Sequence, residues 1–254
     1  MEGVSTAQTT AADHSALRSA VSGARAIADV GVVVVVLVAT NLIAHFTGSW
    51  AALLAVPVSA VLLIGIARRR GLDWHELGLG REHWRSGAKY AAAAVFVVAA
   101  VIVIGALLPV TRGLFLNDRY ATFSTAIIAS MVIIPLQTVI PEELAFRGAL
   151  HGTLSRAMHF RWVVVTGSLL FGFWHIASSL GLTSGNAGLT KILGAGPLAQ
   201  FLGIGGAVLA TAFAGWVFTW LRSRSGSLIA PIALHWCLNG AGALAAAFAW
   251  QLLR

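Results

Sequence analysis

The chain is a series of long apolar runs separated by short polar segments. A helix needs about 20 predominantly apolar residues to cross the hydrocarbon core of a bilayer. Runs of about that size are found at 26–46, 50–67, 88–110, 121–141, 162–180, 200–221 and 227–253. The pattern therefore predicts an all-α fold, a polytopic transmembrane helical bundle of about seven spans. Six to eight spans are compatible with it, because the second run is short and polar residues dilute the first.

The segments outside these runs predict one membrane domain with a polar leader. Residues 1–25 are polar and rich in small residues, without the apolar core that a cleaved signal peptide places there. We expect a polar cytoplasmic segment over 1–25 and a single transmembrane domain over 26–254. Residues 71–84, with tryptophans beside charges, are typical of an interfacial loop. The Gly-rich stretch 181–199 predicts an irregular or re-entrant loop.

Composition excludes several classes of protein. Hydrophobic residues make up 58% of the chain and charged residues 10%, against about 25% charged in an ordinary soluble domain. Too few charges remain to cover a water-soluble surface, so a soluble enzyme and a nucleic-acid-binding domain are excluded despite the net charge of +8. The single cysteine, Cys237, excludes an internal disulfide and a multi-cysteine metal site.

The basic residues predict an orientation. Most of the 17 Lys and Arg residues fall in segments that alternate to one side of the bundle, namely the N-terminal segment, 68–89, 147–161 and 222–224. Cytoplasmic loops carry an excess of Lys and Arg, so we expect this side and the N-terminus to be cytoplasmic. The Ala-, Val- and Arg-rich composition suggests a bacterial plasma membrane.

Acidic residues are concentrated at one point of the C-terminal half. After Asp118 the chain has two, Glu142 and Glu143, next to each other behind an apolar run. A carboxylate in the hydrocarbon costs several kcal/mol and is normally retained for function. Because Pro141 suits the first turn of a helix, the pattern predicts a helix that restarts after a proline-disrupted span. Both carboxylates would then lie at its positive N-terminal end.

Spacing separates the two carboxylates. Glu143 and Arg147 stand at i, i+4, in the order that favours an ion pair on a helix. Glu142 lies about 100° round the helix and has no local cation. Glu143 is therefore predicted to be structural and Glu142 to be free for proton chemistry. The alternative is an acid that stabilises the helix dipole beside an interfacial salt bridge.

Of the eight histidines, His45 ends the first apolar run, and His175 and His235 lie well inside later runs. An imidazole at that depth needs a partner, and it usually faces a bundle interior or a water-filled cavity. His235 and Asn239, at i, i+4, present one helical face. Packing between helices is the alternative for either histidine. The histidines of the polar segments are predicted to lie on the solvated surface: His14, His75, His83, His151 and His159.

The polar groups of the apolar runs support two kinds of chemistry. We expect Glu142, His175, His235 and Asn239 to surround one cavity in the cytoplasmic half of the bundle. They would supply a general base, a second proton-transfer group and donors for a developing oxyanion. Alternatively Glu142, His175 and His235 match a hydrolytic zinc set. No H-E-x-x-H motif is present, so a metal site would be assembled between helices. The cofactor, Zn²⁺ or none, is left open.

Three ordered motifs resemble the CPBP family of intramembrane proteases, which includes the type II CAAX prenyl endopeptidases and bacterial bacteriocin-processing or immunity (abortive-infection) proteins. The first motif is E-E-x-x-x-R, Glu142, Glu143 and Arg147. The second is F-x-x-x-H, Phe171 and His175. The third is H-x-x-x-N, His235 and Asn239. The resemblance covers about 120–245. Each motif alone is weak, but order, spacing and apolar setting together are fairly specific.

The resemblance implies an all-helical bundle with a cavity open to the cytosol and an endopeptidase activity. It implies that Glu142 and His175 activate water and that His235 and Asn239 stabilise the oxyanion. The other motif positions, Glu143, Arg147 and Phe171, would support them. The family is described both as a metalloprotease and as glutamate-dependent without a catalytic metal, and the sequence leaves both open.

The favoured function is therefore intramembrane hydrolysis of a peptide bond in a membrane-associated peptide or lipidated protein, as in CAAX-type processing or bacterial peptide maturation. The expected partners are the lipid bilayer and that substrate, and no nucleic acid. The main alternative is a non-enzymatic immunity or scaffold protein that retains the motifs. A proton-coupled transporter is less favoured, because the proline-disrupted span is found once whereas such transporters commonly have broken helices in both halves.

Overall fold

The computed structural model describes the backbone of residues 3–253 and the side chains of 23–253, apart from those of Ser49 and Ala187. Within residues 3–253 the regular structure is helical, with no strand, which confirms the predicted all-α fold. The α-helices are α1 (Gly3–Phe46), α2 (Ser49–Arg69), α3 (Trp84–Leu107), α4 (Pro109–Arg112), α5 (Phe123–Ile128), α6 (Ile140–Glu143), α7 (His151–Ala157), α8 (Phe160–Trp174), α9 (Ala187–Leu193), α10 (Pro197–Ser225), α11 (Ile229–Trp236) and α12 (Gly242–Gln251).

Wider and tighter turns join these helices. Three segments have π-helical turns: η4 (Ala129–Val139), η5 (Leu144–Leu150) and η7 (Cys237–Ala241). Four short segments are 3₁₀ turns: η1 (Arg81–His83), η2 (Gly113–Phe115), η3 (Asp118–Tyr120) and η6 (Ala177–Ser179). The predicted polar segment 1–25 falls mostly on residues whose side chains lie outside the described part. Its backbone from Gly3 onward belongs to α1.

Six helices are long and apolar enough to cross a bilayer, among the residues described: Gly23–Phe46, Trp50–Arg69, Arg81–Leu107, Phe123–Ala157, Pro197–Ser225 and Ile229–Gln251. The chain is an integral membrane protein. The predicted run 162–180 is instead the short helix α8, of 15 residues. At 1.5 Å per residue it is about 22 Å long, less than the roughly 30 Å of a bilayer core. The count of spanning helices is thus six, where about seven were predicted.

Local hydrogen bonds explain why α8 ends early. The hydroxyls of Ser178 and Ser179 donate to the His175 carbonyl at 3.2 and 2.7 Å, and the Asn41 side chain of α1 donates to the Trp174 carbonyl at 2.9 Å. Serine hydroxyls and amides that bond nearby carbonyls compete with the helical ladder. The chain leaves the helix at His175 and continues through Gly181, whose φ is +80°.

The helix that carries the two glutamates does not restart at Pro141. Residues Phe123–Ala157 form one helix of 35 residues, so the predicted break is wrong. Pro135 lies inside the π-helical segment η4, and Pro141 follows it in α6. π-type adjustments re-satisfy the backbone groups that a proline frees within a membrane. Glu142 and Glu143 therefore lie in the middle of a long helix and not at an N-terminus.

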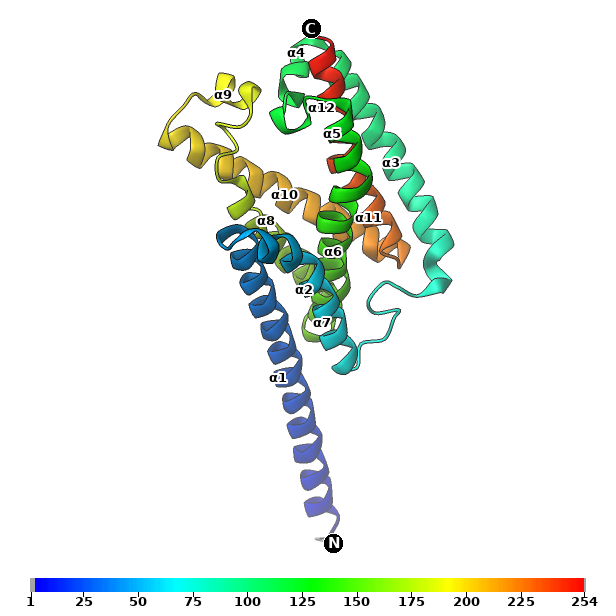
Figure 1. Cartoon of the computed structure of the whole chain (residues 1–254). Coiled ribbons are helices and arrows are strands. Elements are labelled where there is room, and N and C mark those ends of the chain that lie inside the picture. Colours follow the sequence, from blue (N-terminus) through cyan, green and yellow to red (C-terminus); the bar gives the residue numbers. More distant parts are fainter. Residues whose placement is uncertain (1–2, 254) are drawn as a thin grey trace.

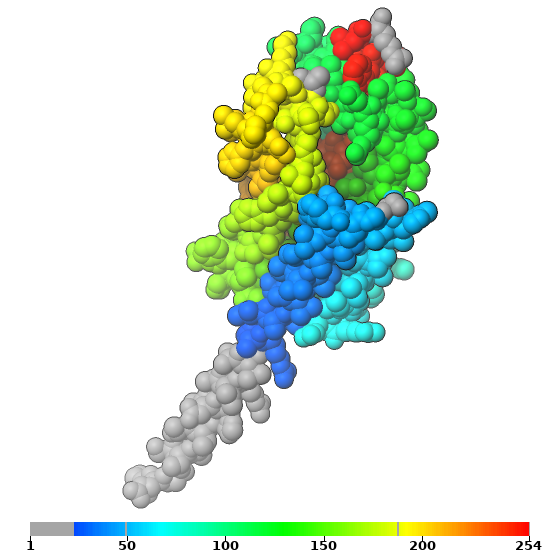
Figure 2. Space-filling view, turned by 60° about the vertical axis from the view of Figure 1, so that its left-hand side comes forward, coloured from blue at the N-terminus to red at the C-terminus, as the bar shows by residue number. Residues whose placement is uncertain are grey.

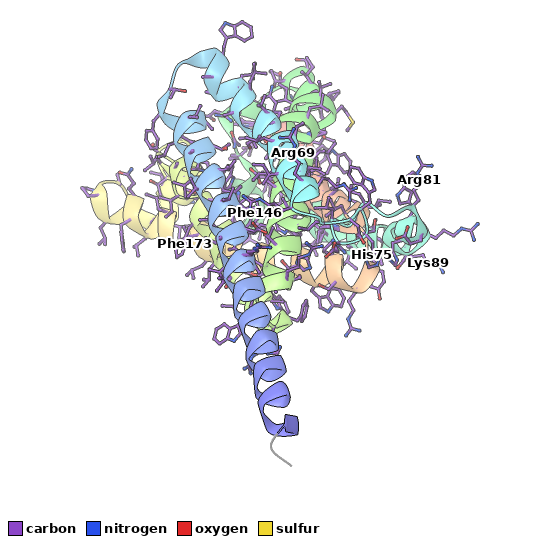
Figure 3. All side chains as sticks on the ribbon, turned by 90° about the horizontal axis from the view of Figure 1, so that it is seen from below. Arg69, His75, Arg81, Lys89, Phe146 and Phe173 are labelled. Atoms are coloured by element: carbon purple, nitrogen blue, oxygen red, sulfur yellow. The ribbon has the colours of Figure 1, made fainter. Side chains whose placement is uncertain are left out.

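The two ends of the bundle differ in their loops. At one end the 71–83 loop meets α7 and the end of α10. There Arg156 donates to the Arg70 and Gly71 carbonyls at 3.3 and 2.8 Å, and Arg222 donates to the His75 and Glu76 carbonyls at 3.1 and 2.9 Å. At the other end α4, α9 and the C-terminus lie together (Figure 1). Seen from below, Arg81 and Lys89 project outward from the loop side (Figure 3).

The stretch predicted as an irregular loop, 181–199, contains the helix α9. Glycines with positive φ stand on both sides of it, Gly181 at +80°, Gly194 at +80° and Gly196 at +98°. A Cβ at Gly188 of α9 would lie 2.5 Å from the Gly113 carbonyl oxygen. This contact places α9 beside η2, which follows α3 and α4. The segment after α8 therefore brings the chain to the end of the bundle opposite the 71–83 loop, despite the shortness of α8.

Close packing between α8 and α10 shapes the centre of the bundle. A Cβ at Gly172 would come within 2.8 Å of the Val208 carbonyl oxygen. This proximity lets the buried rings of Phe171, on α8, and Phe218, on α10, pack edge to face, with ring centroids 6.0 Å apart. Phe146 packs against Phe171 at 5.1 Å. In Figure 2 a hollow opens between the segments coloured green and yellow, and the C-terminal helix is visible at its floor.

We expect Arg156→Lys to lower the stability of the bundle by about 0.5–1 kcal/mol. Arg156 forms a bidentate pair with Glu76, at 2.8 and 2.7 Å, which a lysine cannot reproduce. About a third of each side chain is exposed, so the figure is that of a surface pair. Thermal unfolding in detergent measures it, with Arg224→Lys as the exposed control. An equal loss in both variants would contradict the assignment.

The same pair predicts an acid dependence. Hydrogen bonds from Arg156 hold the pKa of Glu76 below its ordinary value of 4.5. A carboxylate with a depressed folded-state pKa contributes stability above its unfolded pKa, and that stability is lost as the pH falls through the folded value. Glu76→Gln should therefore destabilise the protein at pH 7 and reduce its loss of stability below about pH 4.5. Unfolding curves at several pH values measure both effects.

Candidate active site

An ion cluster with almost no solvent contact lies at the centre of the bundle. Glu143 is 0% exposed and Arg147 is 2% exposed. Arg147 Nη1 lies 3.2 Å from Glu143 Oε1, and its Nη2 donates to the Gly215 carbonyl of α10 at 3.3 Å. The guanidinium also lies over the Phe171 ring, 4.0 Å from its centroid. The ion pair that the i, i+4 spacing predicted is present, and it ties the long helix to α8 and α10.

His235 completes the cluster from α11. Its Nδ1 lies 2.8 Å from the same Glu143 oxygen, and its ring stacks on Phe218 with centroids 5.0 Å apart. An ionised carboxylate only accepts hydrogen bonds, so Nδ1 is the donor and Nε2 points to the other side. A partner that orients one imidazole nitrogen fixes the chemistry of the other. Glu143 thus positions His235 as well as Arg147.

Glu142 has a different environment from Glu143. The Trp174 indole donates to Glu142 Oε1 at 3.0 Å. The second oxygen, Oε2, is buried without a hydrogen-bond partner among the residues described, and it lies 3.9 Å from His235 Nε2. This distance is too long for a direct hydrogen bond. Each carboxylate has one oxygen without a hydrogen-bond partner among the residues described, but Glu143 is bound to two basic side chains through its other oxygen, whereas Glu142 is bound to a neutral indole and lies beside the unengaged imidazole nitrogen.

Trp174 is the site residue that sequence reasoning missed. It directly precedes His175 in an apolar run, and it is 8% exposed. A buried indole N–H usually finds an acceptor, and the two glutamates are the acids available in this half of the chain. The buried indole could have indicated a hydrogen bond from Trp174 to one of the two glutamates. The sequence does not indicate which glutamate accepts it, because the two segments are far apart along the chain.

His175 lies where α8 ends. Its Nδ1 is 2.7 Å from the Phe171 carbonyl oxygen, and its ring packs edge to face on Phe171 at 4.7 Å. Because a carbonyl only accepts, Nδ1 is the donor, and a neutral imidazole then has its lone pair on Nε2. The residue is half-buried. The early end of α8 places this nitrogen at a cavity instead of inside a packed helix.

A cavity of about 590 Å³ brings three of the four predicted residues together. His175, His235 and Asn239 line it, with Thr138 and Ser178. Asn239 lies in the π-helical turn η7 and is exposed. No hydrogen bond involving its side chain is found in the described part, so its amide is free to donate. The rest of the wall is apolar: Val98, Phe171, Ala210, Phe213, Ala214, Val217, Phe218, Leu234 and Leu238, besides the Thr211 side chain.

The structure differs from the expected arrangement at Glu142. Its side chain is absent from the lining of this cavity, because the indole of Trp174 holds one oxygen and His235 approaches the other. Glu142 therefore lies behind His235. The His235 imidazole, with its Nε2, thus lies between the Glu142 carboxylate and the cavity.

The alternative metal set does not converge in this arrangement. Four-coordinate zinc takes its nitrogen and oxygen ligands at about 2.0–2.2 Å. His235 Nε2 and Glu142 Oε2, 3.9 Å apart, are close enough to share such an ion, so the set depends on whether His175 brings a third ligand atom near both. Among the residues described, Glu142, His175 and His235 do not form a group whose ligand atoms all lie within 4.8 Å of one another. The donor set as placed does not fit a metal ion.

Comparison with known proteins adds an independent observation. The family model described as type II CAAX prenyl endopeptidase Rce1-like matches residues 120–241. The chain carries an Rce1-like domain of the CPBP family. The Rce1-like domain covers a little under half of the chain and contains all three motifs, which confirms the resemblance drawn from them. Among curated proteins and among solved structures, no match was found.

The match supports an intramembrane endopeptidase activity in general, and with it a hydrolase. The matched segment runs from η3 through the long helix, α8 and α10 to the end of η7. It therefore includes the ion cluster, Trp174 and the cavity-lining residues on these elements. Helices α1, α2 and α3 lie outside the matched segment.

We expect Glu143→Gln and Arg147→Met each to destabilise the protein by about 3–5 kcal/mol, because each substitution leaves its partner buried and unpaired. Glu142→Gln should change stability little, since the amide oxygen can still accept from Trp174. Unfolding monitored by near-UV circular dichroism in detergent measures the three variants side by side. Equal losses in all three would show that the structural carboxylate has been misassigned.

Proposed function

We propose that the Rce1-like domain is a glutamate-dependent endopeptidase that cleaves a membrane-associated peptide or a lipidated protein. The observation that carries the proposal is the contrast between the two glutamates on either side of His235. Glu143 Oε1 is bound by the Arg147 guanidinium and the His235 imidazole, whereas Glu142 accepts a hydrogen bond only from the neutral Trp174 indole and has its second oxygen 3.9 Å from His235 Nε2. Environments that separate two carboxylates in this way are typical of acid–base sites.

The charge of the cluster supports a proton-accepting role. Two carboxylates and one guanidinium carry one net negative charge when His235 is neutral. When the attacking water gives a proton to this cluster, the net negative charge is neutralised. This transfer is favourable because an unpaired charge is costly in a low-dielectric interior. Glu142 Oε2 has no hydrogen-bond partner among the residues described and lies beside the unengaged Nε2 of His235, so it is the proposed base. A polar contact longer than 3.5 Å has room for a water, and we assign the attacking water to this edge of the cavity.

The imidazoles and the amide have separate roles in the proposed reaction. His175 Nε2, at the cavity wall, shares in removing the proton from water. Protonated Glu142 passes its proton to His235 Nε2, which then donates to the oxyanion together with the Asn239 amide. Collapse of the tetrahedral intermediate breaks the C–N bond, and the proton on His235 goes to the leaving amine. Glu143 and Arg147 are positioning residues, because they act through His235.

The shape and wall of the cavity support an apolar substrate segment. Most of its lining is aliphatic or aromatic, and the remaining lining residues are polar: Thr138, His175, Ser178, Thr211, His235 and Asn239. Ligand sites commonly combine an apolar wall with a few polar groups that fix orientation. A hydrophobic peptide stretch or a lipidated C-terminus suits such a wall, and the polar groups would hold the scissile amide.

Orientation forms part of the proposal. The loop end of the bundle carries Arg70, Arg156 and Arg222, and cytoplasmic loops are the ones enriched in such residues. We place this end and the N-terminus in the cytoplasm of a bacterial cell, with the protein in the plasma membrane.

We expect Glu142→Gln to abolish single-turnover cleavage of a membrane-tethered peptide library by the purified protein. The amide keeps the bond from Trp174 but cannot take a proton. Asp118→Asn, an exposed carboxylate of the same chain, is the matched control and should retain activity. Full activity of the Glu142→Gln protein would refute the glutamate mechanism. Chelator-sensitive activity that zinc restores would instead assign a metal to the site.

Asn239→Ala should lower turnover about 10²–10³-fold, as expected when one oxyanion donor is lost. The cavity wall stays apolar, so binding of the substrate should change less than kcat. The exposed amide of Gln200 provides the control variant Gln200→Ala, which should leave both constants unchanged. A rise in KM with unchanged kcat would make Asn239 a binding residue and not an oxyanion donor.

A further inference from the structure

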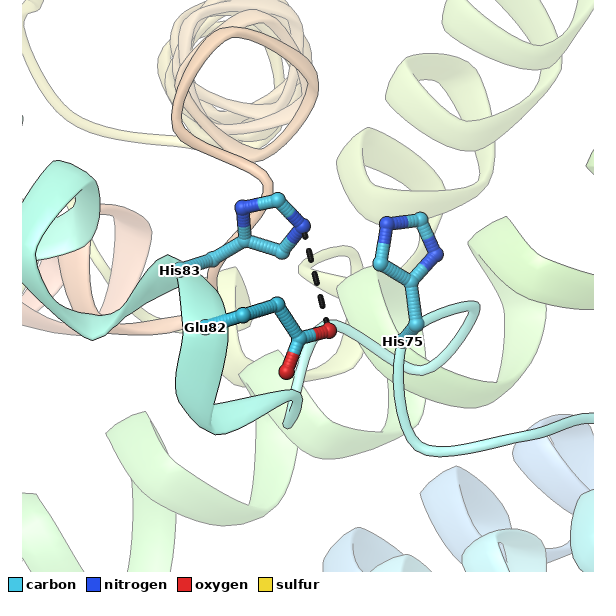
Figure 4. Close-up of side chains that lie close together, drawn as sticks. All are labelled: His75, Glu82 and His83. Carbon is cyan, nitrogen blue, oxygen red and sulfur yellow. Dashed lines mark ion pairs between the residues drawn. The ribbon is translucent and has the colours of Figure 1, made fainter.

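We propose that His75, Glu82 and His83 form a binding site for one zinc-like divalent metal ion at the loop end of the bundle. The three side chains come from the segment that joins α2 and α3, and they gather on one side of that loop (Figure 4). They lie outside the matched domain and apart from the cavity-lining residues. The proposal therefore does not depend on the endopeptidase mechanism.

The distances between the ligand atoms are close to those of a metal site. One ligand atom from each residue lies within 4.8 Å of those of the other two. Nε2 of His83 is 4.0 Å from Oε1 of Glu82, and the two imidazole centroids are 4.9 Å apart. Ligands at about 2.1 Å in a tetrahedron are roughly 3.4 Å from one another. Rotation of the exposed Glu82 and His75 side chains can close the difference.

His83 supplies an observation that points to a ligand. Its Nε2 is shielded from solvent and has no hydrogen-bond partner among the residues described. Its ring packs against Gly226, where a Cβ would lie 2.8 Å from the ring carbon Cγ. Gly226 has a φ of +70° and ends α10. Gly226 therefore packs against one side of the His83 ring, and Nε2 of that ring points toward the Glu82 carboxylate.

The backbone that carries the ligands is fixed by bonds to other elements. Arg222 donates to the His75 and Glu76 carbonyls at 3.1 and 2.9 Å, and the Leu228 amide donates to the Gly78 carbonyl at 2.9 Å. Such support reduces the ordering that metal binding would require. The Arg222 guanidinium is a positive charge in contact with this loop, and the carboxylate of Glu82 supplies a negative charge within the ligand set.

The donor set selects the class of metal. Two imidazole nitrogens and one carboxylate oxygen suit Zn²⁺ and neighbouring transition ions, whereas Mg²⁺ and Ca²⁺ prefer oxygen ligands. His75 and Glu82 are exposed, so water can occupy a fourth position. The ion would clamp the α2–α3 loop where it meets the turn between α10 and α11. The helix α11 that follows this turn carries His235.

The test is metal binding by the full-length protein in detergent after removal of any affinity tag. Zn²⁺ affinity is measured by competition with a chromophoric chelator, and Co²⁺ absorption reports the coordination geometry. We expect one equivalent of metal per chain. His83→Ala and Glu82→Gln should each weaken binding by at least about 100-fold, the upper end of losses seen for outer-shell partners. His159→Ala, an exposed histidine outside the cluster, should bind as the unaltered protein does.

Glu142→Gln and His75→Ala, together with Glu82→Gln, keep the outcome decisive. Glu142→Gln should leave the metal affinity unchanged, which separates this site from the groups at the cavity. Glu82→Gln is exposed and nearly isosteric, so it tests the site even if His83→Ala fails to fold. Metal binding that survives Glu82→Gln and His75→Ala but is lost in Glu142→Gln would overturn the proposal. Failure of the unaltered protein to bind Zn²⁺ or Co²⁺ would overturn it as well.

Discussion

The carboxylate of Glu143, with no solvent contact, lies between the Arg147 guanidinium and the His235 imidazole, and the rest of the bundle is arranged around this contact. A charge buried in a low-dielectric interior is tolerated only when it is paired and hydrogen-bonded. Pairing here requires three elements to meet, because Glu143 and Arg147 lie on the long helix, His235 on α11 and the Gly215 carbonyl on α10. Removal of either partner would leave a charge that the bilayer cannot solvate.

The same cluster determines what the neighbouring groups can do. With Nδ1 of His235 engaged by Glu143, its Nε2 is turned toward the free oxygen of Glu142. The aromatic rings of Phe171 and Phe218 fix the planes of the guanidinium and the imidazole. Electrostatic catalysis needs a rigid arrangement of this kind, because the groups then do not have to reorient during the reaction and no reorganisation free energy is lost.

The sequence predicts local geometry well and long-range geometry less well. The Glu143–Arg147 pair follows from i, i+4 spacing on one helix, and the all-α fold follows from runs of apolar residues. The hydrogen bond from Trp174 to Glu142 depends on how α8 crosses the long helix. The same crossing therefore determines that Glu142 does not line the cavity. The break expected at Pro141 is replaced by π-helical turns, because a membrane helix can widen locally to re-satisfy backbone groups. The short length of α8 depends on serines and Asn41 that a hydropathy count treats as minor interruptions.

The early end of α8 has a consequence for the surrounding lipid. A helix of 15 residues is shorter than the hydrocarbon it faces, and a bilayer accommodates such hydrophobic mismatch by thinning locally. The non-helical backbone from His175 onward can lie at membrane depth only where protein or water covers it. Acyl chains beside α8 would thus be compressed toward the level of His175, and the headgroup layer would dip toward the cavity. A substrate anchored at the membrane surface would then reach the cavity without complete extraction from the lipid.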